Sequence, residues 1–307
     1  MTPLSFETID FRSHGTTLRG RLYRPAGEAP HPAVIMAHGT SATIAMVADR
    51  YAEVFQASGL AVLLYDHRNF GASDGEPRYE INPWVQARGY LDAISYLESV
   101  SGIERDSIAL WGDSYSAAQA LIVAAVDGRA AAVVAQVPSV GRRPAPPDPD
   151  GSLFYALGET LREGAVDGGP DDTVGPLPVV SADQLSAPSL LQPIQAFRWF
   201  IEYGGRYGTG WENRVTRVVP ETPCPFHPGI AAPHLDQPAL FMVAPGDEMP
   251  GSSPEVARTV FDLMPEPKEL CEIDGGHFGL LYHPGNLFDR ASGTQADFLR
   301  RVLCRGE

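Results

Sequence analysis

Cysteine is scarce in this sequence, which has only three in 307 residues: Cys224, Cys271 and Cys304. They are widely separated and lack the CxxC spacing of zinc sites, and an odd number of cysteines does not make a disulfide framework. Such sparse usage is typical of a reducing compartment. His227 and His234 lack metal-ligand spacing to a third ligand. We therefore expect no disulfide framework and no bound metal.

Long apolar runs and basic stretches are also missing. The longest nearly apolar stretch, residues 117–126, is shorter than the roughly 18 residues that a membrane span needs. Residues 1–8 lack a basic region followed by an apolar stretch, so we expect no secretory signal. Acidic residues outnumber basic ones, 38 to 23, and the net charge of −15 would repel a phosphate backbone or an anionic membrane. We predict a cytoplasmic protein that binds neither nucleic acid nor membranes.

The residues that are present predict an α/β fold. Hydrophobic residues make up 44% of the chain and charged residues 20%, as in a globular protein. Residues 5–11 and 17–23 alternate in polarity around a turn and predict a hairpin. Short apolar runs without alternation, which are typical of strands covered on both faces, then alternate with segments of helical spacing. This rhythm predicts βαβ units and a mostly parallel sheet flanked by helices. The runs are residues 33–37, 61–65, 108–111, 131–137, 239–243 and 269–273.

Two helices carry recognisable start signals. Asn82 followed by Pro83 is a plausible N-cap with proline at the first helical position. We predict a closing helix over residues 292–303, because Ser292 and Gln295 have the spacing of a capping box.

Residues 138–238 break this pattern. They hold 16 of the 28 prolines, which disfavours regular sheet strands, yet they are rich in aromatic residues, unlike a disordered linker. We predict a mostly helical cap over 139–235, with helices near 152–164, 181–187 and 192–204. This cap would be inserted into a core made of residues 1–138 and 236–307.

A serine lies between a predicted strand and a predicted helix, where Ser114 stands in the pattern Gly-x-Ser-x-Ser. A serine on such a turn exposes its hydroxyl, and the helix N-terminus offers backbone N–H groups to a developing anion. Asp247 and His277 follow two later strands, and the loops beyond the carboxyl ends of parallel strands carry the chemistry of open sheets. A serine hydroxyl is too weakly acidic to attack unaided. We therefore predict His277 as its base and Asp247 as the acid that orients the imidazole.

Other residues compete for two of these roles. Glu248 or Asp262 could be the acid, although Asp247 directly follows its strand. His283 could be the base, but it precedes Pro284 and lies further from the strand end.

An oxyanion site is predicted beside the serine. The loop His38-Gly39-Thr40 follows the strand at 33–37. Backbone N–H groups of Thr40 and Tyr115 would bind the oxyanion, while His38 and Gly39 would support the loop.

These motifs resemble those of the α/β-hydrolase superfamily over nearly the whole chain. The residues that carry the resemblance are 37–40, 65–75, 111–116, 246–248 and 275–278. The sequence is most similar to dienelactone-hydrolase-like esterases and to Xaa-Pro dipeptidyl-peptidase or cocaine-esterase-like enzymes. The resemblance implies an α/β-hydrolase fold with an inserted cap. Ser116 departs from it, since the motif has glycine there, and its hydroxyl requires a neighbouring strand to make room or to accept a hydrogen bond.

The predicted activity is that of a serine hydrolase, which cleaves an ester or thioester of a small-molecule acyl substrate through an acyl-enzyme and without a cofactor. Acyl transfer and cleavage of an activated C–C bond use the same triad, so both stay open. A peptidase and a non-catalytic binding protein are weaker alternatives. The sequence also leaves open a homodimer.

Overall fold

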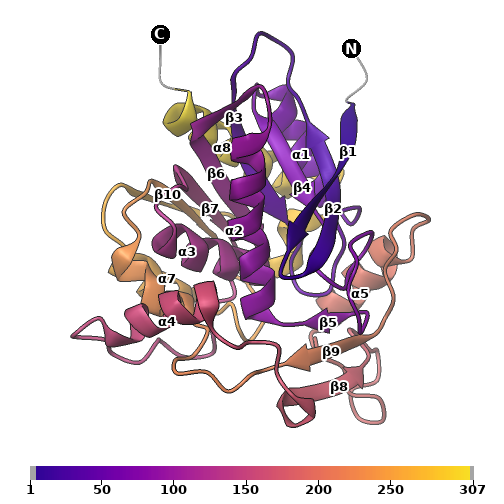
Figure 1. The fold of residues 1–307 in the computed structure, drawn as a ribbon. Helices are drawn as coiled ribbons and strands as arrows, with labels where there is room; N and C mark the ends of the chain where they lie inside the picture. The colour runs from indigo at the N-terminus through magenta and orange to yellow at the C-terminus, as the bar shows by residue number, and fades with distance from the viewer. Residues whose placement is uncertain (1–4, 305–307) are drawn as a thin grey trace.

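The computed structural model describes residues 5–304, which form an eight-stranded sheet between two layers of helices (Figure 1). The strand order is β1-β2-β4-β3-β6-β7-β10-β11. Strand β2 runs antiparallel to both β1 and β4, whereas every other neighbouring pair in this sheet is parallel. The predicted hairpin and the mostly parallel sheet are thus confirmed. The strands are β1 (Phe6–Ser13), β2 (Thr16–Tyr23), β3 (His31–Ala37), β4 (Ala61–Tyr65), β6 (Ile103–Asp113), β7 (Ala132–Gln136), β10 (Ala239–Val243) and β11 (Lys268–Glu272).

The helices cover both faces of this sheet. Their bounds are α1 (Ala48–Ala57), α2 (Pro83–Ser99), α3 (Tyr115–Val126), α4 (Ser152–Glu163), α5 (Ile194–Gly204), α6 (Pro228–Ala231), α7 (Pro254–Leu263) and α8 (Asn286–Leu303), with short 3₁₀ turns η1 (Pro170–Asp172), η2 (Ala232–His234) and η3 (His277–Leu281). Helices α2, α3 and α7 pack on one face, and α1 and α8 pack on the other (Figure 1). None of the helices within residues 5–304 has the length and apolarity to cross a membrane.

Successive side chains along a strand alternate between the two faces of the sheet, so the strand packs against both layers of helices. In β4, Leu63 joins the core on the α2 and α3 side, while Val62 and Leu64 join the core on the α1 and α8 side. All three side chains are fully buried. This two-sided burial explains why the parallel strands show no polar alternation in the sequence.

The start of α2 is as predicted, and the start of α8 is not. The side chain of Asn82 accepts hydrogen bonds from the N–H groups of Trp84 and Val85, with Pro83 at the first position. Helix α8 begins at Asn286, so the predicted capping box at Ser292 is wrong.

The residue assigned to that box, Gln295, instead faces the sheet. Its amide oxygen accepts a hydrogen bond from Trp111 Nε1 at 2.7 Å, and its amide nitrogen donates to Gln136 Oε1 at 2.6 Å. Buried polar groups need such partners, so Gln295 ties α8 to the strands on either side of the Ser114 turn.

The segment 139–235, for which we predicted a cap, contains two of the three predicted helices, α4 and α5. No helix forms at 181–187, because the Asp183 carboxylate accepts hydrogen bonds from the N–H groups of Leu185 and Ser186 and closes a turn instead. The segment also contains strands, so the expectation of none is wrong. Strands β8 (Thr173–Leu177) and β9 (Val215–Val218) form a second sheet with β5 (Glu80–Ile81), in the order β5-β9-β8 (Figure 1).

A proline is tolerated in this second sheet because of its position. Pro176 lies in the edge strand β8, where the pairing with β9 shifts register between Val174 and Leu177. Edge strands and irregular positions are where proline removes no ladder hydrogen bond.

Candidate active site

The turn between β6 and α3 holds Ser114 in a strained conformation, with φ 54° and ψ −115°. Such angles are costly for a residue other than glycine and cluster at functional sites. The turn is held in place because Ser114 N donates to Gln136 O and Ser139 N donates to Ser114 O, each at 2.8 Å. Glycine is required at position 112, since a Cβ atom there would lie 2.3 Å from the backbone of Ser116.

Asp247 and His277 are brought together by adjacent strands. Asp247 follows β10, and His277 begins η3 shortly after β11. The Asp247 Oδ2 and His277 Nδ1 atoms lie 2.8 Å apart, and both side chains are only 2% exposed. Asp247 Oδ1 accepts a second hydrogen bond, from Met249 N at 2.9 Å, so both carboxylate oxygens are engaged. Because Nδ1 of the imidazole is occupied, Nε2 is the nitrogen left for another partner.

Ser114 and His277 line the same cavity, whose volume is about 240 Å³. Their side chains are not hydrogen-bonded to each other in this structure. Hydrogen bonds of this kind often tighten only when substrate is bound.

The competing residues take other positions. Glu248 Oε2 accepts a hydrogen bond from the backbone N–H of His277 at 2.9 Å and does not contact its ring nitrogens. Asp262 lies on α7, away from the cavity lining. The His283 ring packs edge-on against Phe288 and is likewise absent from the lining. Among these carboxylates, only that of Asp247 is paired with the His277 ring.

The residues predicted to bind the oxyanion lie in the same cavity as Ser114. Thr40 and Tyr115 line the cavity together with Gly39 and Ser114. Thr40 N donates to no group among residues 5–304. Tyr115 is the first residue of α3, and the first N–H of a helix has no partner within the helix.

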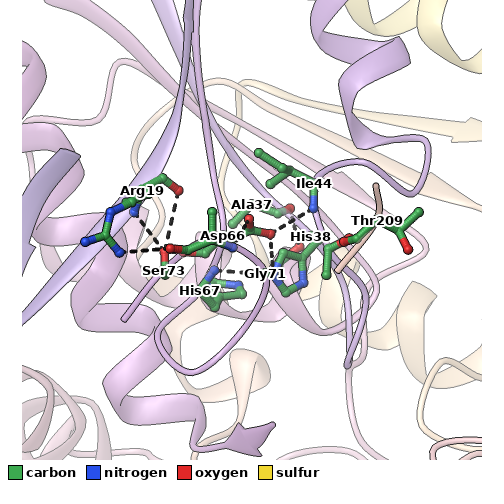
Figure 2. Close-up of polar contacts among 12 residues, drawn as sticks. Arg19, Ala37, His38, Ile44, Asp66, His67, Gly71, Ser73 and Thr209 are labelled. Carbon is green, nitrogen blue, oxygen red and sulfur yellow. Dashed lines mark hydrogen bonds and ion pairs between the residues drawn. The ribbon is translucent and has the colours of Figure 1, made fainter. Parts of the chain in front are cut away.

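His38 is buried and stabilises the loop at residues 38–40. Its Nδ1 lies 2.9 Å from Gly39 O, and its Nε2 accepts a hydrogen bond from His67 N at 3.3 Å (Figure 2). These partners require a neutral ring with the proton on Nδ1. Burial lowers the pKa of His38 and lowers that of His67 further.

Asp66 joins the loops that follow β3 and β4. Its Oδ1 accepts a hydrogen bond from Ile44 N at 3.0 Å (Figure 2). Its Oδ2 accepts one from Ala72 N, also at 3.0 Å. A carboxylate that holds two backbone N–H groups stiffens both loops.

The cavity lining includes many apolar residues, some of which come from α5. Trp199 and Phe200 on this helix line the cavity. Trp199 Nε1 donates to Leu281 O at 3.0 Å, and Tyr203 Oη accepts from His283 N at 2.8 Å. Helix α5 is therefore fastened to the segment that begins at His277. The other apolar lining residues include Ile81, Leu190, Leu191, Met249 and Phe278.

Three charged residues of the lining were not singled out from the sequence: Asp113, Arg142 and Arg217. Burial raises the pKa of Asp113 to about 6, although His277 and the backbone N–H of Gly39 lower it. Arg142 follows β7, and its position beyond the end of a parallel strand was a signal that could have been used. Arg217 gave no such signal, because its strand β9 was not predicted.

Within residues 5–304, no group of three or more His, Cys, Asp or Glu side chains is arranged to hold a metal ion. The three cysteines are free.

Comparisons with known proteins place the chain among enzymes. Residues 14–144 match the family model described as X-Pro dipeptidyl-peptidase (S15 family). The chain is 30% identical to a thiohydrolase of Eupenicillium brefeldianum, over 99% of this chain and 95% of that enzyme. It is 43% identical to the thiohydrolase aneE of Aspergillus aculeatus, although that match covers only 45% of this chain and 41% of that enzyme.

A solved structure agrees over the full length. The α/β hydrolase GrgF from Penicillium sp. sh18 superposes with a TM-score of 0.73 at 28% identity, covering 98% of this chain and 100% of that one. The match covers nearly the whole chain, so the likeness is not confined to the residues of the family model. The chain is therefore an enzyme of the α/β-hydrolase superfamily, and it belongs to the same family as the Eupenicillium thiohydrolase.

Proposed function

We propose that this enzyme cleaves an ester or thioester through an acyl-enzyme on Ser114, with His277 as the base and Asp247 as the orienting acid. The observation that carries the proposal is the 2.8 Å contact between Asp247 Oδ2 and Nδ1 of His277, a histidine that lines the same cavity as Ser114. The thiohydrolase names of the relatives favour a thioester among the two bond types.

The two half-reactions can be followed through their proton transfers. His277 Nε2 accepts the proton of Ser114 Oγ as this oxygen attacks the acyl carbon. The same proton then goes to the alcohol or thiol that leaves, and an acyl-enzyme forms. Water next attacks the acyl carbon and gives a proton to His277. The bond from this carbon to Ser114 Oγ then breaks, the acid is released, and His277 returns the proton to Ser114 Oγ. Asp247 keeps the other imidazole nitrogen protonated and stabilises the imidazolium that forms in each half-reaction.

The backbone N–H groups of Thr40 and Tyr115 would bind the oxyanion of each tetrahedral intermediate. Loss of one such donor typically costs about 100- to 1000-fold in rate. Bracing of the loop by His38 fits this role, since donors that are already in position need no reorganisation during the reaction.

Residues 139–235 would act as a cap that shields the acyl-enzyme. The segment contributes Leu190, Leu191, Trp199 and Phe200 to the cavity. An apolar wall of this kind suits an acyl chain and excludes water.

A fluorophosphonate probe, which reacts with activated serines, tests the proposal directly. We expect the folded enzyme to be labelled and to hydrolyse hexanoyl-N-acetylcysteamine, a simple thioester. Ser114→Ala should abolish both. Ser139→Ala, a matched serine of the same cavity, should leave the labelling in place.

An unlabelled, folded enzyme with no turnover of thioesters or of p-nitrophenyl esters would refute the proposal. Labelling that persists in Ser114→Ala would assign the nucleophile elsewhere. Transfer to an alcohol or amine uses the same acyl-enzyme, and would be recognised in this assay by an ester or amide product in place of the free acid.

A further inference from the structure

Two arginines line the cavity beside Ser114 and reach it from different parts of the fold. Arg142 lies in the loop after β7, and Arg217 lies on β9 of the second sheet. Neither forms an ion pair with a carboxylate among residues 5–304, whereas Arg129, for example, is held by two acids. Both side chains are exposed, so their charges stay hydrated and available to a ligand.

The charge of the cavity is opposite to that of the chain. The chain carries a net charge of −15, which repels anions from most of its surface. Among the lining residues, Asp113 alone is a carboxylate. Asp113 is buried next to the nucleophile, whereas both arginines are exposed, and two positive charges exceed one negative charge. The two arginines therefore make the open part of the cavity locally positive.

A neutral donor lies close to one of these charges. Tyr115, which directly follows Ser114, also lines the cavity, and its hydroxyl forms no hydrogen bond with any described residue. Burial raises the pKa of this phenol to about 12, while the nearby positive charge of Arg217 lowers it. An anion that contacts Arg217 would thus also meet an O–H donor beside the nucleophile.

From this arrangement we infer that the substrate carries a carboxylate or phosphate group that binds between Arg142 and Arg217 while its acyl carbon reaches Ser114. The inference rests on the proposed function and specifies its substrate class. Guanidinium groups suit this task, because their planar donors match carboxylate and phosphate oxygens in pairs. Two sources supply such a group in an acyl thioester: a carboxylate at the far end of the acyl chain, or the phosphate of a 4′-phosphopantetheine leaving group.

Matched thioesters distinguish the two sources. One pair is hexanoyl- and adipyl-N-acetylcysteamine, which differ by the terminal carboxylate of the acyl chain. The other is hexanoyl-pantetheine and hexanoyl-4′-phosphopantetheine, which differ by the phosphate. We expect the enzyme to prefer the charged member of one pair by about tenfold or more in kcat/KM, since a charged hydrogen bond contributes that much. The preference should fall at high salt.

Arginine variants then assign the preference to the site. Arg142→Gln and Arg217→Gln should each lower the charged-to-neutral ratio of kcat/KM by about tenfold, mainly through KM. Arg217→Lys keeps the positive charge but lacks the planar guanidinium group. It should therefore retain part of the preference for the charged thioester. Arg143→Gln is the matched control, because Arg143 is exposed, adjacent in sequence and absent from the lining. Its ratio should equal that of the unmodified enzyme.

Equal kcat/KM within both pairs, or a preference that survives in the Arg142→Gln/Arg217→Gln double variant, would overturn the inference. Calorimetry with the corresponding thioethers, which cannot be hydrolysed, separates this failure from a failure of the proposed function. The charged thioether should bind the enzyme more tightly than its neutral partner, whether or not Ser114 is the nucleophile.

Discussion

The hydroxyl of Ser116 lies 3.0 Å from the carbonyl oxygen of Ala37 on the neighbouring strand β3. It also lies 2.9 Å from Asp113 O and accepts a hydrogen bond from Asp113 N at 3.0 Å. Ser116 is fully buried, so its hydroxyl proton must find its acceptor among buried groups, and these two carbonyls are within hydrogen-bond distance. The neighbouring strand thus accommodates Ser116, which replaces the glycine of the family motif. The Ser116 hydroxyl also links the start of α3 to β6.

Ser116→Ala should lower the free energy of unfolding by about 1–2 kcal/mol, because it removes the acceptor of a buried N–H group. Turnover should stay within about threefold, since the hydroxyl faces away from the cavity lining. Denaturant unfolding and an ester assay measure the two effects. A loss of turnover above a hundredfold in a stably folded variant would show that this hydroxyl acts in the reaction.

Asp247→Asn should reduce kcat by about 10⁴-fold, as expected when an amide replaces the carboxylate that sets the histidine tautomer. Glu248→Gln is the control, because its amide oxygen can still accept the His277 backbone N–H. We expect it to keep turnover within about tenfold. Steady-state kinetics on one thioester decide the matter: a larger loss in Glu248→Gln than in Asp247→Asn would reassign the acid.

Asp113→Asn should stabilise the protein at alkaline pH. The folded-state pKa of Asp113, about 6, is above its ordinary value of 3.8, so ionisation costs stability. This cost is absent below pH 3.8, grows through the window up to pH 6 and is complete above it. We expect Asp113→Asn to gain about 2 kcal/mol at pH 8 and less at pH 5. Denaturant unfolding at both pH values would contradict this if the gain were larger at pH 5.

His67→Phe should reduce the sensitivity of the fold to acid. Neither ring nitrogen of His67 has a hydrogen-bond partner among the described residues, and the ring packs between Tyr65, Tyr90 and His38. Because burial lowers its pKa, its contribution to stability is complete above pH 6.5 and is lost as pH falls. Its removal should recover up to about 2 kcal/mol at pH 5.

His38→Phe is the contrasting variant, since it deletes the contact with Gly39 O and the acceptor of His67 N–H. We expect it to destabilise the fold by about 2 kcal/mol at pH 8, and by less at pH 5, because burial lowers the pKa of His38 and the buried ring then costs stability in acid. Equal destabilisation by both variants would mean that the His67 ring holds a hydrogen bond after all. Thermal or denaturant unfolding from pH 5 to pH 8 provides the comparison.

Sequence reasoning was accurate where local signals and burial agree. The fully buried runs at residues 61–65 and 239–243 coincide with β4 and β10, and Asn82-Pro83 starts α2. The strand ends then placed Ser114, Asp247 and His277 at one edge, because parallel strands share a direction.

It failed where contacts between distant segments decide the structure. Ser292 and Gln295 have the spacing of a helix start, yet both are buried in the middle of α8, where Gln295 is held by partners on β6 and β7. Strand β9 forms only by pairing with β5 and β8, and its short sequence shows no alternation. Arg217 could not be placed in the cavity before that pairing was known.

Gln295 also bears on when the enzyme becomes competent during synthesis. Its partners, Trp111 and Gln136, lie 184 and 159 residues earlier in the chain. Asp247 and His277 also follow α5 in the chain and are therefore synthesised after it. The hydrogen bonds behind the Ser114 turn can therefore form only after α8 has been synthesised, long after β6 and β7. A chain truncated before α8 would have the serine turn, the acid and the histidine but not this support, so full reactivity of the serine should appear only once α8 has been added.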